Sequence, residues 1–144
     1  MQSKKKRMSS VLNKFAKAIA RKKKVTKVNN ATPNEFDGIK FKSKLETYTY
    51  QKLQENGIQA AYEGERFTLI PAFNYQNEAV RAMTYLPDFV GKDFIIECKG
   101  FGNDAFPLRW KIFKYTLYQQ KMNYKLYLVK NKKDVDQLIE NLKN

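Results

Sequence analysis

The sequence contains no histidine, and Cys98 is its single cysteine. The lack of histidine excludes zinc sites with histidine ligands and acid–base catalysis by imidazole. One cysteine leaves no possibility of an internal disulfide. The sequence also has no apolar run as long as a transmembrane helix and no apolar signal-peptide stretch at its N-terminus. We therefore expect a cytoplasmic protein that does not act on membranes and whose chemistry depends on carboxylates, lysine and a metal ion.

Acidic residues are missing from the first 30 residues, which contain eleven basic ones. This segment supplies most of the formal net charge of +14 and leaves a net charge of only +3 to the rest of the chain. Such a concentration of positive charge predicts a polyanionic partner, and we expect DNA. We divide the chain into a basic N-terminal arm, residues 1–33, and a folded domain, residues 34–144. The arm residues expected to bind DNA are Lys4, Lys5, Lys6, Arg7, Arg21, Lys22, Lys23 and Lys24.

Two states of the arm are compatible with its sequence. Val11, Phe15 and Ile19 recur every four residues, which favours a short basic amphipathic helix when the arm is bound. The composition otherwise predicts a flexible, solvated segment in the absence of DNA. Docking of this helix on a membrane surface is the weaker alternative, because the arm has no tryptophan and is not rich in leucine.

A predicted β-hairpin carries the most specific group of polar residues. Residues 81–90 and 92–98 both have strand-like sequences, and we place the turn at Gly91 and Lys92. Alternate residues of a strand share a face, so Ile95, Glu97 and Lys99 point one way, and Phe94, Ile96 and Cys98 point the other way. This turn pairs Asp88 with Ile95, which makes Glu97 the diagonal neighbour of Asp88 on the same face.

Two carboxylates and a lysine on one face predict a cation site. Oxygen ligands suit Mg²⁺ or Mn²⁺, which complete their coordination with water and substrate phosphate. A lysine beside them can hold the attacking water and offset charge on the phosphate. The implied reaction is hydrolysis of a phosphodiester. The alternative is a solvated hairpin with a surface ion pair, because so short a motif also arises by chance.

Around this hairpin the sequence predicts an ordered series of helices and strands. Residues 43–56 suit a helix with Ser43 as its N-cap, residues 62–71 a first strand, and the hairpin the second and third strands. Residues 107–122 suit a second helix with Leu108, Ile112 and Tyr115 on its apolar face. Residues 125–129 suit a fourth strand, and residues 134–142 a last helix. The resulting order, αβββαβα, predicts an α/β fold with a mixed central sheet flanked by helices.

Four segments of the sequence resemble a family of small bacteriophage endonucleases. They are residues 36–46, 84–90, 96–100 and 109–113, and the resemblance covers about residues 35–129. That family belongs to the PD-(D/E)XK nuclease superfamily and is related to phage endonuclease I and the Holliday-junction resolvases. The resemblance implies a restriction-endonuclease-like αβββαβ core for residues 34–144. It also implies a dimer, because resolvases of this superfamily usually cut two strands as dimers.

The resemblance assigns roles to individual residues. It implies that Asp88 and Glu97 bind one or two Mg²⁺ or Mn²⁺ ions, that Lys99 is the catalytic lysine, and that Glu46 contributes directly or through water. Glu46 also forms a capping-box pattern with Ser43, which is the structural alternative. Cys98 is expected in the core and contributes at most its backbone carbonyl to the metal. The basic residues of the second helix, Arg109, Lys111 and Lys114, either follow the phosphate path or form an outer helix face.

Together these features predict a Mg²⁺-dependent endodeoxyribonuclease, encoded by a phage and present in the host cytoplasm. Its expected substrate is branched or recombining DNA, as for a Holliday-junction resolvase. The alternative is a non-catalytic DNA-binding or packaging protein on a nuclease-like scaffold. The intact set of Asp88, Glu97 and Lys99 favours the enzyme, because a scaffold has no need for an unpaired acidic pair.

Overall fold

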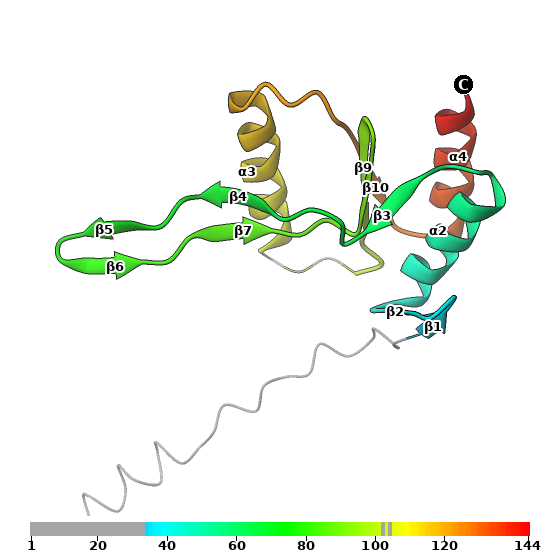
Figure 1. Cartoon of the computed structure of the whole chain (residues 1–144), viewed down its shortest axis with the longest axis horizontal. Coiled ribbons are helices and arrows are strands. Elements are labelled where there is room, and N and C mark those ends of the chain that lie inside the picture. The colour runs from blue at the N-terminus through cyan, green and yellow to red at the C-terminus, as the bar shows by residue number, and fades with distance from the viewer. Residues whose placement is uncertain (1–33, 102, 104) are drawn as a thin grey trace, which may run out of the picture. The chain divides into compact units, whose positions relative to one another are not determined.

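The computed structural model describes residues 34–101, 103 and 105–144 (Figure 1). The chain divides into two units, residues 1–31 and 32–144, and the predictions for the basic arm lie outside the described residues. The second unit is a mixed α/β domain with the helices α2 (Lys44–Glu55), α3 (Phe106–Gln119) and α4 (Lys132–Lys143). In the described part of the chain, no helix has the length and apolar character that crossing a membrane requires.

The central sheet has four strands in the order β10-β9-β8-β3. Its strands are β3 (Ala60–Tyr62), β8 (Phe89–Gly91), β9 (Phe94–Cys98) and β10 (Lys125–Val129). Strand β8 pairs antiparallel with both β3 and β9, whereas β9 and β10 are parallel and are connected through α3. The predicted α/β class and the mixed sheet are confirmed. The four sheet strands and three helices follow the order αβββαβα once β1, β2 and β4 to β7 are left aside, but the first sheet strand is Ala60–Tyr62 and not the predicted strand at 62–71.

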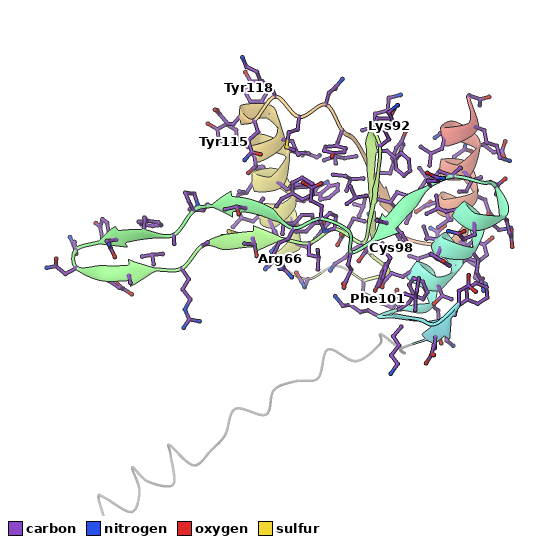
Figure 2. All side chains as sticks on the ribbon, in the orientation of Figure 1. Arg66, Lys92, Cys98, Phe101, Tyr115 and Tyr118 are labelled. Carbon is purple, nitrogen blue, oxygen red and sulfur yellow. The ribbon has the colours of Figure 1, made fainter. Side chains whose placement is uncertain are left out.

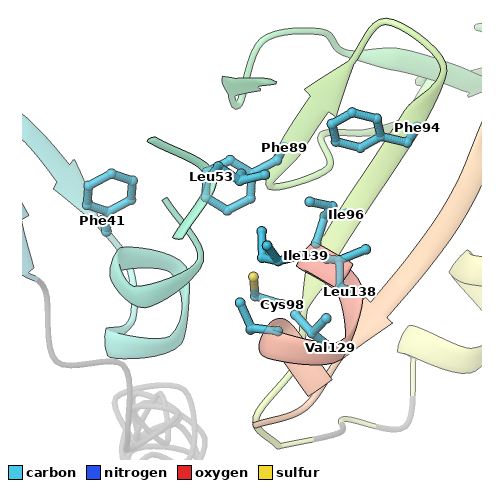
Figure 3. Packing of buried hydrophobic residues seen from close by; sticks show 10 residues of the cluster. Phe41, Leu53, Phe89, Phe94, Ile96, Cys98, Val129, Leu138 and Ile139 are labelled. Carbon is cyan, nitrogen blue, oxygen red and sulfur yellow. The ribbon is translucent and has the colours of Figure 1, made fainter. Parts of the chain in front are cut away.

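Helices cover both faces of this sheet because its strands are apolar on both faces. On one face, Phe94, Ile96 and Cys98 of β9 pack with residues of α2 and α4, including Leu53 and Val135 (Figure 3). On the other face, Ile95 packs with Phe113 and Leu117 of α3. The alternation predicted for residues 94–98 is therefore confirmed. Glu97 and Lys99 share the parity of Ile95 and lie on the α3 side.

The two hairpin strands meet in a different register from the predicted one. Phe89 pairs with Ile96 and Val90 with Ile95, and the same register places Asp88 directly opposite Glu97. The prediction that Asp88 pairs with Ile95 is wrong, because the turn lies one residue later, at Lys92 and Asp93. Gly91 belongs to β8, where a Cβ atom would come within 2.3 Å of the Phe94 ring. Its glycine therefore gives room to that ring and does not form the turn.

A long excursion separates β3 from β8, where the sequence predicted continuous strands. It consists of β4 (Phe67–Ile70), β5 (Phe73–Tyr75), β6 (Glu78–Val80) and β7 (Met83–Tyr85). Strand β4 pairs with β7, and β5 pairs with β6, so the excursion is one extended hairpin (Figure 1). The predicted strand at 62–71 is broken after Tyr62 because Glu63 has a φ of 47°. The predicted strand at 81–90 is interrupted by Pro87, which has no backbone N–H to donate to a ladder.

The predicted helices are confirmed, but not every predicted face. The Ser43 side chain caps α2 by accepting a hydrogen bond from the Glu46 N–H. In α4, Val135, Leu138 and Ile139 are buried. In α3 the buried residues are instead Phe113, Thr116 and Leu117. Leu108 and Tyr115 are exposed, and Tyr115 and Tyr118 project from α3 in Figure 2, so the predicted apolar face is wrong.

Two further strands, β1 (Asn34–Phe36) and β2 (Ile39–Phe41), were not predicted. They form a short antiparallel hairpin around Asp37 and Gly38, which both have positive φ angles. Asp-Gly is a strong signal for a two-residue hairpin turn. This hairpin leads directly to Ser43 and so places the start of α2 beside β3.

Candidate active site

Asp88 and Glu97 face each other across the start of β8 and the end of β9. Asp88 accepts a hydrogen bond of 2.7 Å from the Cys98 N–H, which holds its carboxylate against β9. Glu97 is only 8% exposed and accepts a hydrogen bond of 2.6 Å from the Tyr85 hydroxyl. Both carboxylates line a cavity of about 330 Å³, which we call the acidic cavity. The two predicted metal ligands are therefore brought together.

The electrostatics of this pair favour a bound cation. Burial, followed by repulsion from Glu97 and Glu46, raises the pKa of Asp88 to about 8. Burial also raises the pKa of Glu97, although the Tyr85 hydroxyl and the Lys99 charge oppose the shift. Neither carboxylate has a salt-bridge partner within the described residues. Because buried anions without a counter-charge are costly, a positive ion in the cavity would be strongly favoured.

Positive side chains line the same cavity around the two carboxylates. Lys99 lies two residues after Glu97, and its Nζ is 4.9 Å from the centroid of the Phe106 ring. Arg109 reaches the cavity from the first turns of α3, and Arg66 reaches it from the loop before β4. The cavity is thus lined by two carboxylates and several basic side chains, an arrangement that can hold a cation and a phosphate together.

Glu46 is buried at the start of α2, and both of its carboxylate oxygens accept hydrogen bonds. One carboxylate oxygen accepts from the Ser43 hydroxyl at 2.8 Å, and the other accepts from the Lys42 N–H and the Tyr62 hydroxyl. The capping-box alternative is therefore realised in part, because Ser43 accepts from the Glu46 N–H but Glu46 accepts from the Lys42 N–H in place of the Ser43 N–H. Glu46 does not line the acidic cavity among the described residues, but it lies close enough to raise the pKa of both Asp88 and Glu97. Its geometry suits a contact through water better than a direct one.

Cys98 is buried in the core, as predicted. Its Sγ lies 3.4 Å from the Thr49 Oγ1 of α2, and burial raises the pKa of the thiol well above its usual value. A neutral thiol in this setting is a core side chain and a poor metal ligand. What Cys98 provides to the site is its backbone, because its N–H fixes the Asp88 carboxylate.

The basic residues of α3 divide between two cavities. Arg109 lines the acidic cavity, whereas Lys111 and Lys114 line a neighbouring groove. Arg109 thus lies at the carboxylates, and Lys111 and Lys114 lie in a groove that shares Lys99 and Phe106 with the acidic cavity. The eight basic residues assigned to DNA in the arm lie outside the described part of the chain.

Three residues of the site were not identified from the sequence. Tyr85 donates a hydrogen bond to Glu97, and Lys42, which pairs with Glu63, lines the acidic cavity together with Arg66. Tyr85 lies three residues before Asp88, within the segment predicted as the first hairpin strand, so its place in the sequence was a signal for it. Lys42 and Arg66 had none, because their approach depends on the positions of β2 and β4.

The residues present suit an ion such as Mg²⁺, whose coordination is completed by water and phosphate, better than a metal held by protein ligands alone. No group of three or more His, Cys, Asp or Glu that could hold a metal occurs among residues 34–101, 103 and 105–144. Mg²⁺ is commonly bound by one or two carboxylates, with water and substrate phosphate completing its shell. Asp88 and Glu97 supply that minimum, and their lack of a basic partner leaves them available.

Comparison with known proteins gives a family but no activity. Part of the chain is 40% identical over 57 residues to the uncharacterized protein YwbO of Bacillus subtilis (strain 168). That alignment covers 40% of this chain and 26% of the relative, so the chain spans about a quarter of that protein's length. No solved structure matches the chain. Residues 21–133 match the family described as "Protein of unknown function (DUF1064)", and the chain belongs to this family.

Proposed function

We propose that the protein is a metal-dependent endonuclease that hydrolyses phosphodiester bonds in branched or recombining phage DNA. The observation that carries this proposal is the pair of half-buried Asp88 and buried Glu97, which face each other in a cavity that basic side chains also line and which have no salt-bridge partner among the described residues. A carboxylate pair of this kind destabilises the fold when it is empty of cations. Its presence is therefore best explained by a ligand that brings positive charge.

The arrangement of elements supports the PD-(D/E)XK assignment. The central sheet and its helices follow the order α2, β3, β8, β9, α3, β10, which corresponds to the αβββαβ core that the resemblance implies. Asp88 precedes one hairpin strand, Glu97 ends the next, and Lys99 follows at the strand end. These are the positions that the Pro-Asp and Glu-x-Lys motifs require.

Each residue of the site has a separate task. Asp88 and Glu97 would hold one or two Mg²⁺ or Mn²⁺ ions, with the Cys98 carbonyl and a water on Glu46 as further contacts. When bound, such an ion lowers the pKa of water and neutralises charge on the phosphate. Lys99 positions the attacking water and stabilises the negative charge that builds on the phosphate oxygens. Arg66 and Arg109 orient the phosphate from the cavity walls, and Tyr85 fixes the Glu97 carboxylate.

The basic arm would contribute DNA affinity, and a second copy of the chain would contribute a second active site. The basic arm tracks the DNA backbone through counterion release, and a homodimer would place two sites on two strands. The rival function is a DNA-binding or packaging protein without catalysis. The acidic cavity disfavours this function, because Asp88 and Glu97 would repel phosphate and lower the stability of the fold without contributing to DNA binding.

The test is cleavage of a four-way junction, a fork, a flap and a plain duplex, each with Mg²⁺ and with EDTA. We expect Asp88→Asn and Glu97→Gln to reduce cleavage to the level seen with EDTA. DNA binding, measured by fluorescence anisotropy, should stay the same or tighten because a negative charge near phosphate is removed.

The matched control is Asp93→Asn, which removes an exposed carboxylate from the turn of the same hairpin. It should cleave like the wild type. Cleavage by Asp88→Asn or Glu97→Gln at a rate near that of this control would refute the metal site. A wild-type protein that binds all four substrates and cuts none would favour the packaging function.

A further inference from the structure

A second and larger cavity adjoins the acidic cavity and shares Lys99 and Phe106 with it. Its volume is about 680 Å³, within the range of cavities that bind small organic ligands. Its floor is formed by Phe101, Phe106, Trp110 and Leu128, and we call it the aromatic groove. Nothing in the proposed hydrolysis uses this floor.

The groove lies where two parallel strands end. Lys99 and Lys130 directly follow β9 and β10, and the Lys99 N–H donates to the Val129 carbonyl at 2.8 Å. Helix α3 lines the groove through Phe106, Trp110 and Lys114, which recur every four residues and so share one helix face. Crevices at the carboxyl ends of parallel strands are frequent ligand sites in α/β proteins.

The groove combines flat aromatic rings with positive charge. The rings of Phe106 and Trp110 stack with centroids 5.6 Å apart, and Phe101 is 78% exposed beside them. Lysines 99, 111, 114 and 130 surround the rings, and the Lys114 Nζ is 5.9 Å from the centroid of the Trp110 ring. None of the described residues that line the groove is acidic. A complementary ligand therefore has a flat, apolar body and carries negative charge.

We propose that the aromatic groove binds an unpaired base of the DNA strand whose phosphate lies in the acidic cavity. The inference rests on the proposed function and deepens it by naming the feature of the substrate that is recognised. The two cavities are neighbours because Lys99 and Phe106 line both of them, so adjacent nucleotides of one strand can reach both. A base stacked within a duplex cannot enter the groove unless it leaves the stack, whereas a base at a branch or bulge is already available.

Trp110 allows a direct test, because it is the single tryptophan of the chain and lies on the floor of the groove. The full-length protein, in EDTA to prevent cleavage, is titrated with three duplexes of equal length. One has a single bulged thymine, one has an abasic nucleotide at that position, and one is fully paired. We expect strong quenching of Trp110 fluorescence by the bulged thymine and little by the other two. Equal quenching by the thymine and abasic duplexes would overturn the proposal, because the abasic nucleotide keeps the phosphate but has no base.

A pair of double variants tests the residues. Phe101→Ala with Lys114→Gln alters two exposed groove residues, and Tyr118→Ala with Lys121→Gln makes the same kinds of change in the last turn of α3 and the turn that follows it. Loss of one stacked base should weaken binding of the bulged duplex by about tenfold in the first variant. The second variant should bind like the wild type, and binding of the fully paired duplex should change little in either. Equal losses in both double variants would contradict a base site in the groove.

This experiment separates the inference from the function on which it rests. Fluorescence quenching in EDTA reports the groove alone, whereas cleavage reports the acidic cavity. Cleavage of the bulged duplex without base-dependent quenching would overturn the groove proposal and leave the endonuclease standing. Base-dependent quenching without cleavage of any substrate would support base binding in the groove and refute the proposed endonuclease activity.

Discussion

Tyr85 is the residue on which the state of Glu97 most directly depends. Its hydroxyl donates to Glu97 at 2.6 Å in a buried setting and lowers the pKa of that carboxyl. We expect Tyr85→Phe to raise the pKa of Glu97 and to move the onset of metal binding to higher pH. Loss of this hydrogen bond leaves the Glu97 carboxylate without its donor and should lower the free energy of unfolding by about 1–3 kcal/mol. Calorimetric titration of Mg²⁺ across a pH series measures the first effect, with Tyr127→Phe on β10 as the control. An unchanged onset would show that the hydroxyl does not act on Glu97.

Asp88 makes the stability of the metal-free protein depend on pH. Its pKa is 3.8 in the unfolded chain and about 8 in the folded protein, so the folded state binds more protons between these values. The free energy of unfolding should therefore be highest at low pH and fall as the pH rises towards about 8. Asp88→Asn should flatten this fall, and Mg²⁺ should stabilise the wild type more at pH 8 than at pH 5. Thermal melts of both proteins across pH check the sign. A wild-type Tm that rises over this range would contradict a raised pKa for Asp88.

Lys99 acts on water and phosphate in the proposed mechanism and is not a metal ligand. Lys99→Ala should therefore lower the single-turnover rate by orders of magnitude while calorimetry shows metal affinity largely retained. Lys92→Ala, at the turn of the same hairpin, is the matched control and should cleave normally. Loss of metal binding in Lys99→Ala would instead make Lys99 a structural partner of the carboxylates.

Helix α2 is the element in which a structural and a functional role meet. Ser43→Ala removes the cap and should cost about 1 kcal/mol in urea unfolding, with cleavage retained at saturating Mg²⁺. Glu46→Gln removes the charge and keeps an acceptor for the Tyr62 hydroxyl, so it should fold normally and cleave poorly. Full cleavage by Glu46→Gln would leave Glu46 with the capping role alone.

At the level of elements, the sequence predicted the central fold because its signals were local. The Ser43 cap, the apolar residues of α4 and the alternation through β9 are each contained within one segment. The hairpin register was wrong, yet the site was found. Moving a turn by one residue changes each pairing by two, and side chains then keep their faces.

The long excursion could not be predicted, since its turn does not use the expected residues. Gln76 and Asn77 both have positive φ angles, 47° and 66°, in a position where glycine is the usual signal. The faces of α3 failed for a different reason. Thr116 is buried while Tyr115 is exposed, and this choice depends on how α3 packs on β9. Such packing is decided by tertiary contacts and leaves no local pattern.

At the scale of the whole molecule, the charge of the arm should act on binding and not on chemistry. In a full-length variant with Lys4–Arg7 and Arg21–Lys24 changed to glutamine, DNA affinity should fall and its dependence on salt should flatten. Each lost phosphate contact reduces the slope of log affinity against log salt by roughly 0.9 on duplex DNA. At low salt and saturating protein, the cleavage rate should approach that of the wild type. An unchanged salt slope would show that these residues do not contact DNA.

The buried thiol of Cys98 has a consequence for measuring motion in this protein. It lies between Glu97 and Lys99 on the strand that carries the site, and it is shielded from solvent. A thiol reagent can reach it only when this strand opens, so the labelling rate reports the opening equilibrium at the place where chemistry is proposed. Comparing that rate with global unfolding in urea would tell whether β9 opens alone or with the entire domain. Cys98 thus serves as a built-in probe for local opening of strand β9.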